Sequence, residues 1–259
     1  MDDSALYARM RGNLKEFCRL MGGASPQARV IELEGVVASV VPATPHHSLV
    51  NSVAYDTPDE LEQALPALVD AYAGSGIDAW AVWVPEGDER ATQLLGRAGH
   101  VLDAAPAVMC MELSNLRAPR PDDLDLDPEP RVETLAALND AAYGTAPDMA
   151  LAVRSMPDDV VLYVARDDGR PVSCLGTHDL DGDCCILYVA TAPEARGRGL
   201  AGRLMSLALH DARARGATTT SLQATKMGYP IYARLGYRDL GALEMWEWRK
   251  AAPTRTGQG

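Results

Sequence analysis

The feature that most limits the fold of this chain is an apolar run, a glycine-rich turn and an amphipathic stretch in direct succession. Cys184–Ala190 is apolar and short, as expected of a buried strand. Leu200–Arg215 carries apolar residues at helical spacing and Gly216 follows it, which predicts a helix. A strand that leads into a helix in this way is typical of sheets with helices on their faces. The sequence therefore favours a mixed α/β fold.

The turn at Arg196–Gly202 reads Arg-Gly-Arg-Gly-Leu-Ala-Gly. Gly197 and Gly199 have no side chain to cover the main chain, so their N–H groups can face a ligand at the positive end of the helix dipole. Arg196 and Arg198 add positive charge at the rim of this turn. The pattern predicts an anion site that suits a pyrophosphate.

Two familiar phosphate-binding patterns do not fit this turn. The chain has no P-loop, since no Gly-Lys-Ser or Gly-Lys-Thr follows a glycine at the required spacing. Gly197, Gly199 and Gly202 do match the dinucleotide fingerprint, but six residues separate the strand end from the first glycine, too many for a tight Rossmann turn. The next expected strand, Thr218–Ala224, has no acidic residue at its end to hold a ribose.

Composition excludes several classes of protein. The chain is 47% apolar and 23% charged, as in soluble globular proteins, and no run of 18 apolar residues predicts a membrane span. Met1–Ser4 is acidic with no apolar region behind it, so we expect a cytoplasmic protein. A net charge of −12 argues against a nucleic-acid partner, although residues 196–238 hold eight bases and one acid and favour an anion there. The five cysteines are scattered and predict neither disulfides nor a metal site.

The segment at 117–130 divides the chain, because it holds four prolines and five acidic residues. We expect a first domain at 1–116, a linker or first strand at 117–130, a second domain at 131–250 and a disordered tail at 251–259. The sequence patterns of both domains predict the same order of elements, namely strand, helix, strand, short helix with glycine, and strand. We therefore expect a mixed α/β (α+β) sheet with helices on both faces, in two tandem copies.

The expected elements follow from hydrophobic spacing and from turn residues. Helices are predicted at 4–21, 57–72, 88–97, 132–143, 148–155, 200–215 and 229–235. Strands are predicted at 30–41, 48–55, 79–84, 160–165, 171–178, 184–190, 218–224 and 242–248, and residues 101–113 are predicted to form an extended pair or one bent strand.

At Arg196–Ala201 the chain resembles the GNAT superfamily of acyl-CoA N-acyltransferases. The pyrophosphate loop of that family has Gln or Arg, two variable residues, Gly, one variable residue, and Gly or Ala, which this segment matches. The strand before it, with its Val-x-Thr-x-Pro ending at Pro193, and the segment Tyr232–Tyr237 are similar to two further family signatures. The resemblance covers roughly residues 122–249. The matching loop of the first domain, Thr57–Glu62, is acidic and lacks glycine, so we expect a degenerate copy without a cofactor.

The resemblance implies an N-acetyltransferase that uses acetyl-CoA as co-substrate. A primary amine of a small molecule or peptide would attack the thioester directly, beside a strand that splays from its neighbour near Val189. The backbone N–H of Val189 or Ala190 would stabilise the oxyanion, and Tyr232 would protonate the departing thiolate. The implied cofactor contacts are Val189, Ala190, Thr191, Arg196, Gly197, Arg198, Gly199, Leu200, Ala201, Gly202, Thr225 and Tyr229.

The general base and the acceptor site stay open at this stage. Candidates for the base are Asp183, His178 and Glu244. Three further residues, Tyr143, Met149 and Met156, lie where the family places its acceptor-binding loops, and the acidic residues of 121–159 suit a cationic amine. The adjacent His46 and His47 lack a partner at ligand spacing and are expected to be exposed.

A second hypothesis is a non-catalytic acyl-CoA-binding sensor or interaction protein. Thr225 stands where the family commonly has Asn, and Gly228 and Pro230 depart from its usual helix. We expect a monomer or a homodimer, with no nucleic-acid, membrane or metal partner.

Overall fold

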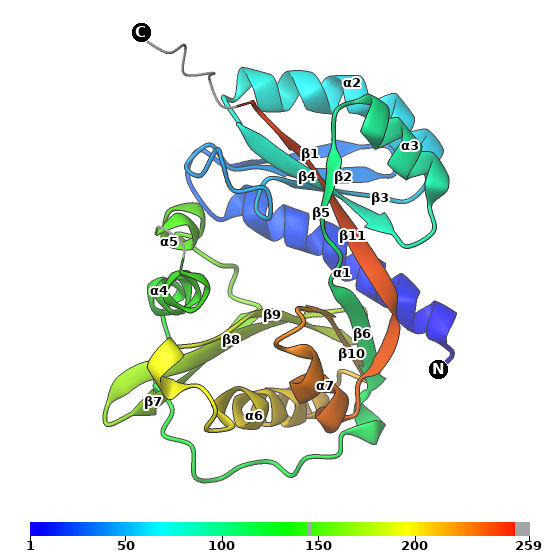
Figure 1. Cartoon of the computed structure of the whole chain (residues 1–259). Coiled ribbons are helices and arrows are strands. Elements are labelled where there is room, and N and C mark those ends of the chain that lie inside the picture. Colours follow the sequence, from blue (N-terminus) through cyan, green and yellow to red (C-terminus); the bar gives the residue numbers. More distant parts are fainter. Residues whose placement is uncertain (145–146, 252–259) are drawn as a thin grey trace, which may run out of the picture.

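The computed structural model describes residues 1–144 and 147–251, and Figure 1 shows its arrangement. The strands lie in two groups, one in the upper and one in the lower part of the view, with a long helix between them. We call residues 1–116 the first segment and residues 131–250 the second segment. Except for its first residue, the tail predicted at 251–259 lies outside the described residues.

The elements alternate between helix and strand along both segments. The α-helices are α1 Asp3–Gly23, α2 Pro58–Gly74, α3 Glu89–Arg97, α4 Val132–Tyr143, α5 Asp148–Ala152, α6 Leu200–Arg215 and α7 Tyr229–Leu235, with short 3-10 helices η1 Leu113–Asn115 and η2 Pro193–Ala195. The strands are β1 Arg29–Leu33, β2 Val36–Val40, β3 Ser52–Tyr55, β4 Ala79–Pro85, β5 Val101–Ala104, β6 Ala107–Glu112, β7 Val160–Asp167, β8 Arg170–Leu180, β9 Asp183–Thr191, β10 Thr219–Ala224 and β11 Arg238–Arg249.

The single strand predicted at 30–41 is a hairpin. β1 and β2 pair antiparallel, with Leu33 opposite Val36, and the chain turns at Gly35 with a φ of +66°. The prediction was wrong because the turn is only two residues long, Glu34 and Gly35, and offers one glycine but no Asn-Gly or Asp-Gly pair. The next strand also begins later than predicted, at Ser52 instead of Ser48.

The two segments share one connectivity. In the first, β1, β2 and β3 pair antiparallel in sequence order, and α2 crosses over to bring β4 parallel to β3. In the second, β7, β8 and β9 pair antiparallel in the same way, and α6 crosses over to bring β10 parallel to β9. A parallel pair needs such a helical crossover, whereas two-residue turns join the antiparallel pairs β1–β2, β7–β8 and β8–β9, and a longer connection at 41–51 joins β2 to β3.

Each segment gives its last strand to the strand group of the other. β6 of the first segment lies between β10 and the beginning of β11, where Met111 faces Thr220 and Cys110 faces Arg238. The later residues of β11 lie between β4 and β5, where Trp246 faces Val82. The linker at 117–130 therefore divides the chain in sequence while the strands of the two segments interlock in space.

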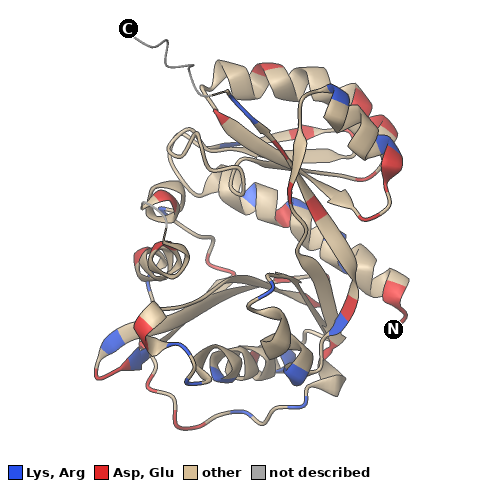
Figure 2. Ribbon diagram, in the orientation of Figure 1, with Lys and Arg blue, Asp and Glu red and all other residues tan. Residues whose placement is uncertain are grey.

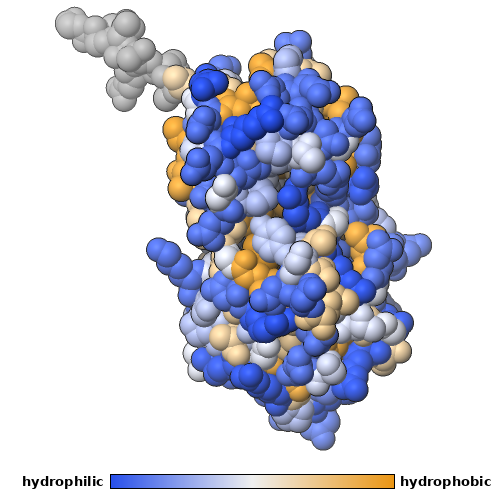
Figure 3. Space-filling model, turned by 90° about the vertical axis from the view of Figure 1, so that its right-hand side faces the viewer, coloured by the Kyte–Doolittle hydropathy of each residue, from blue (hydrophilic) through white to orange (hydrophobic). Residues whose placement is uncertain are grey.

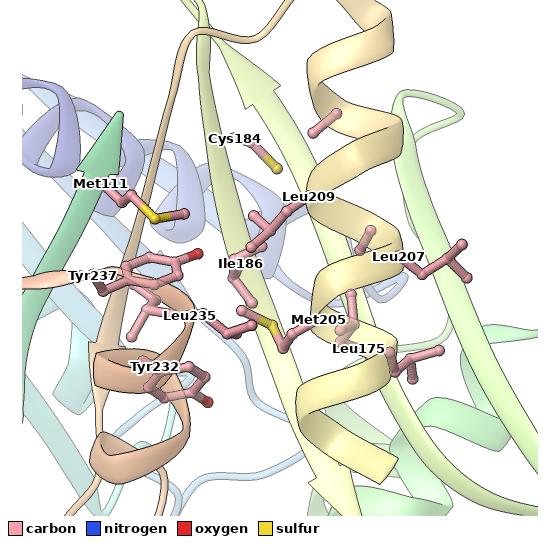
Figure 4. Close-up of a cluster of buried hydrophobic side chains, with 14 of the residues drawn as sticks. Met111, Leu175, Cys184, Ile186, Met205, Leu207, Leu209, Tyr232, Leu235 and Tyr237 are labelled. Atoms are coloured by element: carbon pink, nitrogen blue, oxygen red, sulfur yellow. The ribbon is translucent and has the colours of Figure 1, made fainter. Parts of the chain in front are cut away.

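Helices cover both faces of the sheet, as predicted. α1 packs against strands of both segments and buries Met10 and Cys18 with Val108 and Met245. Figure 4 shows the core under α6, where Met205 and Leu209 face Ile186 of β9. Each such buried side chain contributes about 1.5–3 kcal/mol relative to its exposed state.

The surface is mainly polar. On the face turned to the viewer in Figure 3, hydrophobic residues lie singly or in small groups among hydrophilic ones, which is normal for a protein surface. Among the described helices, none is long and apolar enough to cross a membrane. No group of three or more His, Cys, Asp or Glu side chains suited to a metal ion occurs within residues 1–144 and 147–251.

Candidate active site

The turn before α6 presents bare main chain. Gly197 and Gly199 adopt left-handed φ values of +77° and +75°, and a Cβ atom built on either would meet nothing within 4 Å. Gly199 is the N-cap of α6 and, as a glycine, has no side chain to cap the first N–H groups of this helix. The left-handed conformation favours glycine, and the open space above it leaves room for a ligand at the helix N-terminus.

The two arginines of this turn are engaged with protein groups. Arg196 donates from Nη2 to the Ala142 carbonyl at 2.5 Å and from Nε to the Thr191 carbonyl at 3.3 Å. Arg198 forms two hydrogen bonds with Asp167, at 2.6 and 3.1 Å, which hold the pKa of that carboxyl below its usual value. The attraction of the turn for an anion therefore depends mainly on main-chain N–H groups and the helix dipole.

Other bases of the stretch 196–238 are paired as well. Figure 2 marks Lys and Arg positions on α6, above a linker that carries positions of both charges. Arg203 pairs with Asp123, and Arg215 pairs with Asp179 at 2.7 Å. These contacts reduce the excess positive charge that the sequence places in this stretch.

β9 and β10 separate beside this turn, as the resemblance implies. Their pairing runs from Asp183 opposite Thr219 to Cys185 opposite Ser221 and goes no further. β9 continues to Thr191 and β10 to Ala224, so the two strands diverge beyond this point. The main-chain groups of β9 that face the gap are available to an extended ligand.

A bulge in β9 directs this main chain. The register with β8 shifts between Cys174 opposite Ala190 and Gly176 opposite Leu187, and Tyr188 there adopts a φ of +55°. Asn139 on α4 donates from Nδ2 to the Tyr188 carbonyl at 3.1 Å. A left-handed tyrosine costs about 1–3 kcal/mol and persists where surrounding contacts fix it. The sequence gives no glycine at this position, so the bulge was not predicted.

One cavity of about 1480 Å³ joins these features. Ligand pockets usually measure about 300–1000 Å³, so this volume suits two substrates together. Of the predicted site residues, those that line it are Val189, Ala190, Thr191, Arg196, Gly197, Gly199, Leu200, Ala201, Gly202, Thr225 and Tyr232. Arg198 and Tyr229 are not among the lining residues; Tyr229 instead lies beside Asp239, which raises the pKa of its phenol.

Tyr232 enters the cavity from α7. Figure 4 shows its ring projecting from this helix toward the gap beside β9. The residue is 7% exposed, and burial raises the pKa of its hydroxyl above the ordinary value. A Cβ atom on Gly228 would lie 2.8 Å from Cε2 and 3.2 Å from Oη of Tyr232. Gly228, a departure from the family pattern, therefore lets the main chain pack against the phenol.

The structure does not bring the three predicted bases into the cavity. Asp183 is buried at the start of β9, where it accepts hydrogen bonds from Asn13 at 2.6 Å and Ser221 at 2.7 Å. His178 pairs with Asp159 at 3.2 Å. The Glu244 carboxylate accepts a hydrogen bond from Nε1 of Trp246 on β11. None of these three is a lining residue.

Residues of the first segment complete the cavity, and the sequence did not single them out. They are Leu14, Phe17, His47, Leu49, Trp83 and Pro106. The prediction that both adjacent histidines are exposed was wrong for His47, which is half-buried; His46 is exposed and contacts Asp148 at 3.1 Å. Of the three residues predicted near the acceptor, Tyr143 and Met149 line the cavity and Met156 does not.

Residues 158–239 match the family model of the acetyltransferase (GNAT) domain. The matched residues run from just before β7 to the start of β11 and include the glycine turn, the splayed strands and Tyr232. Acyl transfer from acyl-CoA is the activity that this domain implies. No curated protein matches the chain.

Several solved structures share the fold. A GCN5-related N-acetyltransferase from Kribbella flavida has 20% identity and a TM-score of 0.68 over 95% of this chain and 96% of its own. A GCN5-related N-acetyltransferase from Sphaerobacter thermophilus has 18% identity and a TM-score of 0.57 over 83% and 76%. A tandem GNAT protein from the clavulanic acid biosynthesis pathway has 12% identity and a TM-score of 0.55 over 95% and 96%. At these identities the likeness concerns the fold alone.

Proposed function

We propose that the chain is an acetyl-CoA-dependent N-acetyltransferase of the cytoplasm that transfers the acetyl group to a primary amine of a small molecule or peptide. One observation carries the proposal: the uncapped N-terminus of α6, the open edge of β9 and the Tyr232 phenol all face one cavity. The turn at 197–201 would bind the diphosphate, and main-chain groups of Val189–Thr191 would pair with the pantetheine amides.

The residues of this chain fit direct transfer. The neutral amine attacks the thioester carbonyl carbon, the C–N bond forms, and a main-chain N–H of Val189 or Ala190 stabilises the oxyanion. When the C–S bond breaks, Tyr232 donates its proton to the sulfur. Because burial raises the pKa of Tyr232, the phenol holds this proton throughout the neutral range.

We further propose that the first segment is a degenerate copy with no cofactor of its own. Its helix α2 begins with a complete capping box, in which Thr57 N and Oγ1 donate to Glu60 at 2.9 and 2.7 Å. The Glu60 carboxylate also lies against Gly35. A carboxylate already occupies the positive end of this helix and would repel a pyrophosphate.

The experiment compares wild type with Tyr232→Phe in a thiol-release assay with acetyl-CoA and a panel of amines. We expect kcat to fall about 100-fold or more, with the dissociation constant of acetyl-CoA unchanged, since the phenol acts on the leaving group. Tyr229→Phe is the matched control, because this tyrosine lies on the same helix outside the cavity. Equal rates for wild type and Tyr232→Phe would remove the phenol from the reaction.

Binding of the co-substrate is tested by Gly199→Arg. We expect calorimetry to show no acetyl-CoA binding, because the side chain fills the space above the turn. Gly169→Arg controls for backbone strain, since Gly169 has a φ of +74° and open space in the β7–β8 hairpin. Unchanged affinity in Gly199→Arg would exclude the turn as the diphosphate site. Tight acetyl-CoA binding without any acetylated product would favour a sensor over an enzyme.

A further inference from the structure

We propose that the first segment supplies the acceptor subsite, which takes a primary amine attached to a hydrophobic or aromatic body, and that His47 removes the proton from its ammonium group. This inference rests on the proposed acetyl transfer. It gives the first segment a direct part in the reaction, although that segment has no cofactor site of its own.

The hydrophobic part of the subsite comes from separate elements. Leu14 and Phe17 project from α1, Trp83 from β4, and Leu49 from the turn before β3, and all line the cavity that Tyr232 enters. Phe17 also packs against Tyr188 of the β9 bulge, with ring centroids 6.3 Å apart. The subsite therefore adjoins the bulge that directs the main chain of Val189 and Ala190. Apolar walls favour an apolar body and make burial of additional charges costly.

The polar part of the subsite is formed by two titratable residues of the cavity wall, and two more lie outside the cavity. His47 and Asp140 line the cavity, and His46 and Asp148 lie close to His47. Both carboxylate oxygens of Asp140 accept main-chain hydrogen bonds, from Met149 at 3.0 Å and Ala150 at 3.2 Å. The exposed neighbour His46 contacts Asp148. Of the two histidines, His47 is thus the one that faces the cavity.

The turn that carries His47 is held in place by Asn51. Its buried Oδ1 accepts a hydrogen bond from Val41 N at 2.7 Å. Its Nδ2 donates hydrogen bonds to the carbonyls of Thr44 at 2.9 Å and His47 at 3.1 Å. His47 N also donates to the Thr44 carbonyl at 3.1 Å. A base must be fixed relative to the group it deprotonates, and these bonds fix the backbone of His47.

The protonation state of His47 suits a base. Burial lowers its pKa, His46 lowers it further, and the carboxylates of Asp148 and Asp140 oppose this shift. The imidazole is therefore neutral at neutral pH, whereas an alkyl ammonium has a pKa of about 10.

The protons balance over the whole reaction. One ammonium proton passes to the imidazole, and the neutral amine attacks. The attacking nitrogen, now bonded to the acetyl carbon, loses a second proton to solvent, and solvent returns a proton to Tyr232 after the phenol has protonated the sulfur. The imidazolium then returns its proton to solvent.

The substrate class is tested with two amines, 2-phenylethylamine and spermidine. We expect kcat/KM for 2-phenylethylamine to be at least about tenfold higher, and Phe17→Ala to lower it about tenfold or more through the loss of buried aromatic surface. Acetyl-CoA affinity is measured in the same proteins and should stay unchanged. A failure to acetylate 2-phenylethylamine, or a rate that Phe17→Ala leaves unaltered, overturns the subsite.

The base is tested with His47→Gln, and His46→Gln is the matched control. At pH 7 we expect His47→Gln to lower kcat/KM for 2-phenylethylamine by about 100-fold or more. The variant rate should then rise with pH and approach the wild-type rate near pH 10, about the pKa at which the amine is neutral in solution. Wild type should lose activity in acid with a midpoint below about pH 6.5, the ordinary pKa of histidine, because burial lowers the pKa of His47, and His46→Gln should keep this acid limb.

The outcomes separate this inference from the proposed function. A deficit in His47→Gln that is constant at all pH values indicates a structural role and overturns the base assignment, and thermal melting shows whether each variant is folded. Spermidine acetylation that both variants leave unchanged overturns the subsite and keeps the acetyltransferase. If acetyl-CoA does not bind at all, the proposed function itself fails.

Discussion

His100 is a buried residue whose environment disfavours its charge. It is 2% exposed, its ring meets the Trp80 ring edge-on with centroids 4.4 Å apart, and neither ring nitrogen has a hydrogen-bond partner among the described residues. Burial lowers the pKa of this histidine to about 4. Between about pH 4 and about pH 6.5, His100 is therefore neutral in the native protein but protonated in the unfolded chain.

The consequence is a loss of stability in acid. As pH falls from about 6.5 to about 4, His100 binds a proton in the unfolded chain but stays neutral in the native protein. The free energy of unfolding therefore decreases by up to about 3 kcal/mol. Above this range His100 contributes no pH dependence. Urea unfolding at pH 7, 5.5 and 4.5 should show a shallower decrease for His100→Phe, which keeps an aromatic ring beside Trp80. His46→Gln should behave like wild type, and parallel curves for wild type and His100→Phe would contradict the assignment.

Single residues differ in how far the sequence reveals them. The glycines at 197 and 199 were predicted because the need for bare main chain at a helix N-terminus restricts the residue type. Tyr232 was predicted from a resemblance that spans consecutive positions. His47 and Phe17 were missed because they lie far from the GNAT motifs in sequence, and only tertiary packing brings them to the cavity.

At the scale of elements, the N-terminus of α7 packs against Tyr232, the residue that this helix directs into the cavity. Gly228 precedes this helix with a φ of −78°, a value that any residue adopts, so its lack of a side chain matters for space alone. The nearest atoms to a Cβ there belong to the Tyr232 ring. The first turn of α7 thus sets where the phenol points.

Gly228→Ala tests this contact. The new methyl group would stand 2.8 Å from Cε2 and must displace the ring, so we expect kcat to fall about tenfold while acetyl-CoA affinity changes little. Gly96→Ala in α3 is a matched control, because a Cβ atom there meets nothing within 4 Å. An unchanged kcat in Gly228→Ala would mean that the phenol position does not limit the reaction.

Elements with strong local signals were predicted well and those without them were not. α2 has its cap, its first-turn proline and its acids in the sequence, and it begins at Pro58 as these residues indicate. The β1–β2 turn and the β9 bulge lack such signals. In the bulge, a hydrogen bond from Asn139 and packing against Phe17 hold Tyr188 in a conformation that its own residue type does not favour.

At the scale of the whole molecule, the exchange of β6 and β11 makes the segments depend on each other. Without β6, the edge of β10 would be unpaired, and the core that β6 fills with Met109 and Met111 would be open to water. Without the end of β11, β4 and β5 would lose the strand between them. The sequence did not reveal this exchange, because the pattern of a strand shows which face is buried and not which distant strand it pairs with.

We therefore expect one cooperative unfolding transition. All four tryptophans lie on β4 and β11, at positions 80, 83, 246 and 248, so their fluorescence reports the upper strand group. Acetyl-CoA binding reports the second segment, and both signals should be lost at the same urea concentration. A fragment of residues 117–259 should neither fold nor bind acetyl-CoA unless residues 1–116 are supplied with it. Two separate transitions would contradict this interdependence.

The interlocked strands also restrict how the two segments can move around the cavity. Many two-part enzymes close around a substrate by rotation about a hinge. Here such a rotation would break the inter-strand hydrogen bonds that β6 and β11 form with strands on both sides. The space between the segments consequently has a fixed aperture. Under the proposed acetyl transfer, we expect an acceptor too wide for that aperture to be excluded, however reactive its amine, and products to leave through local movements of side chains and turns.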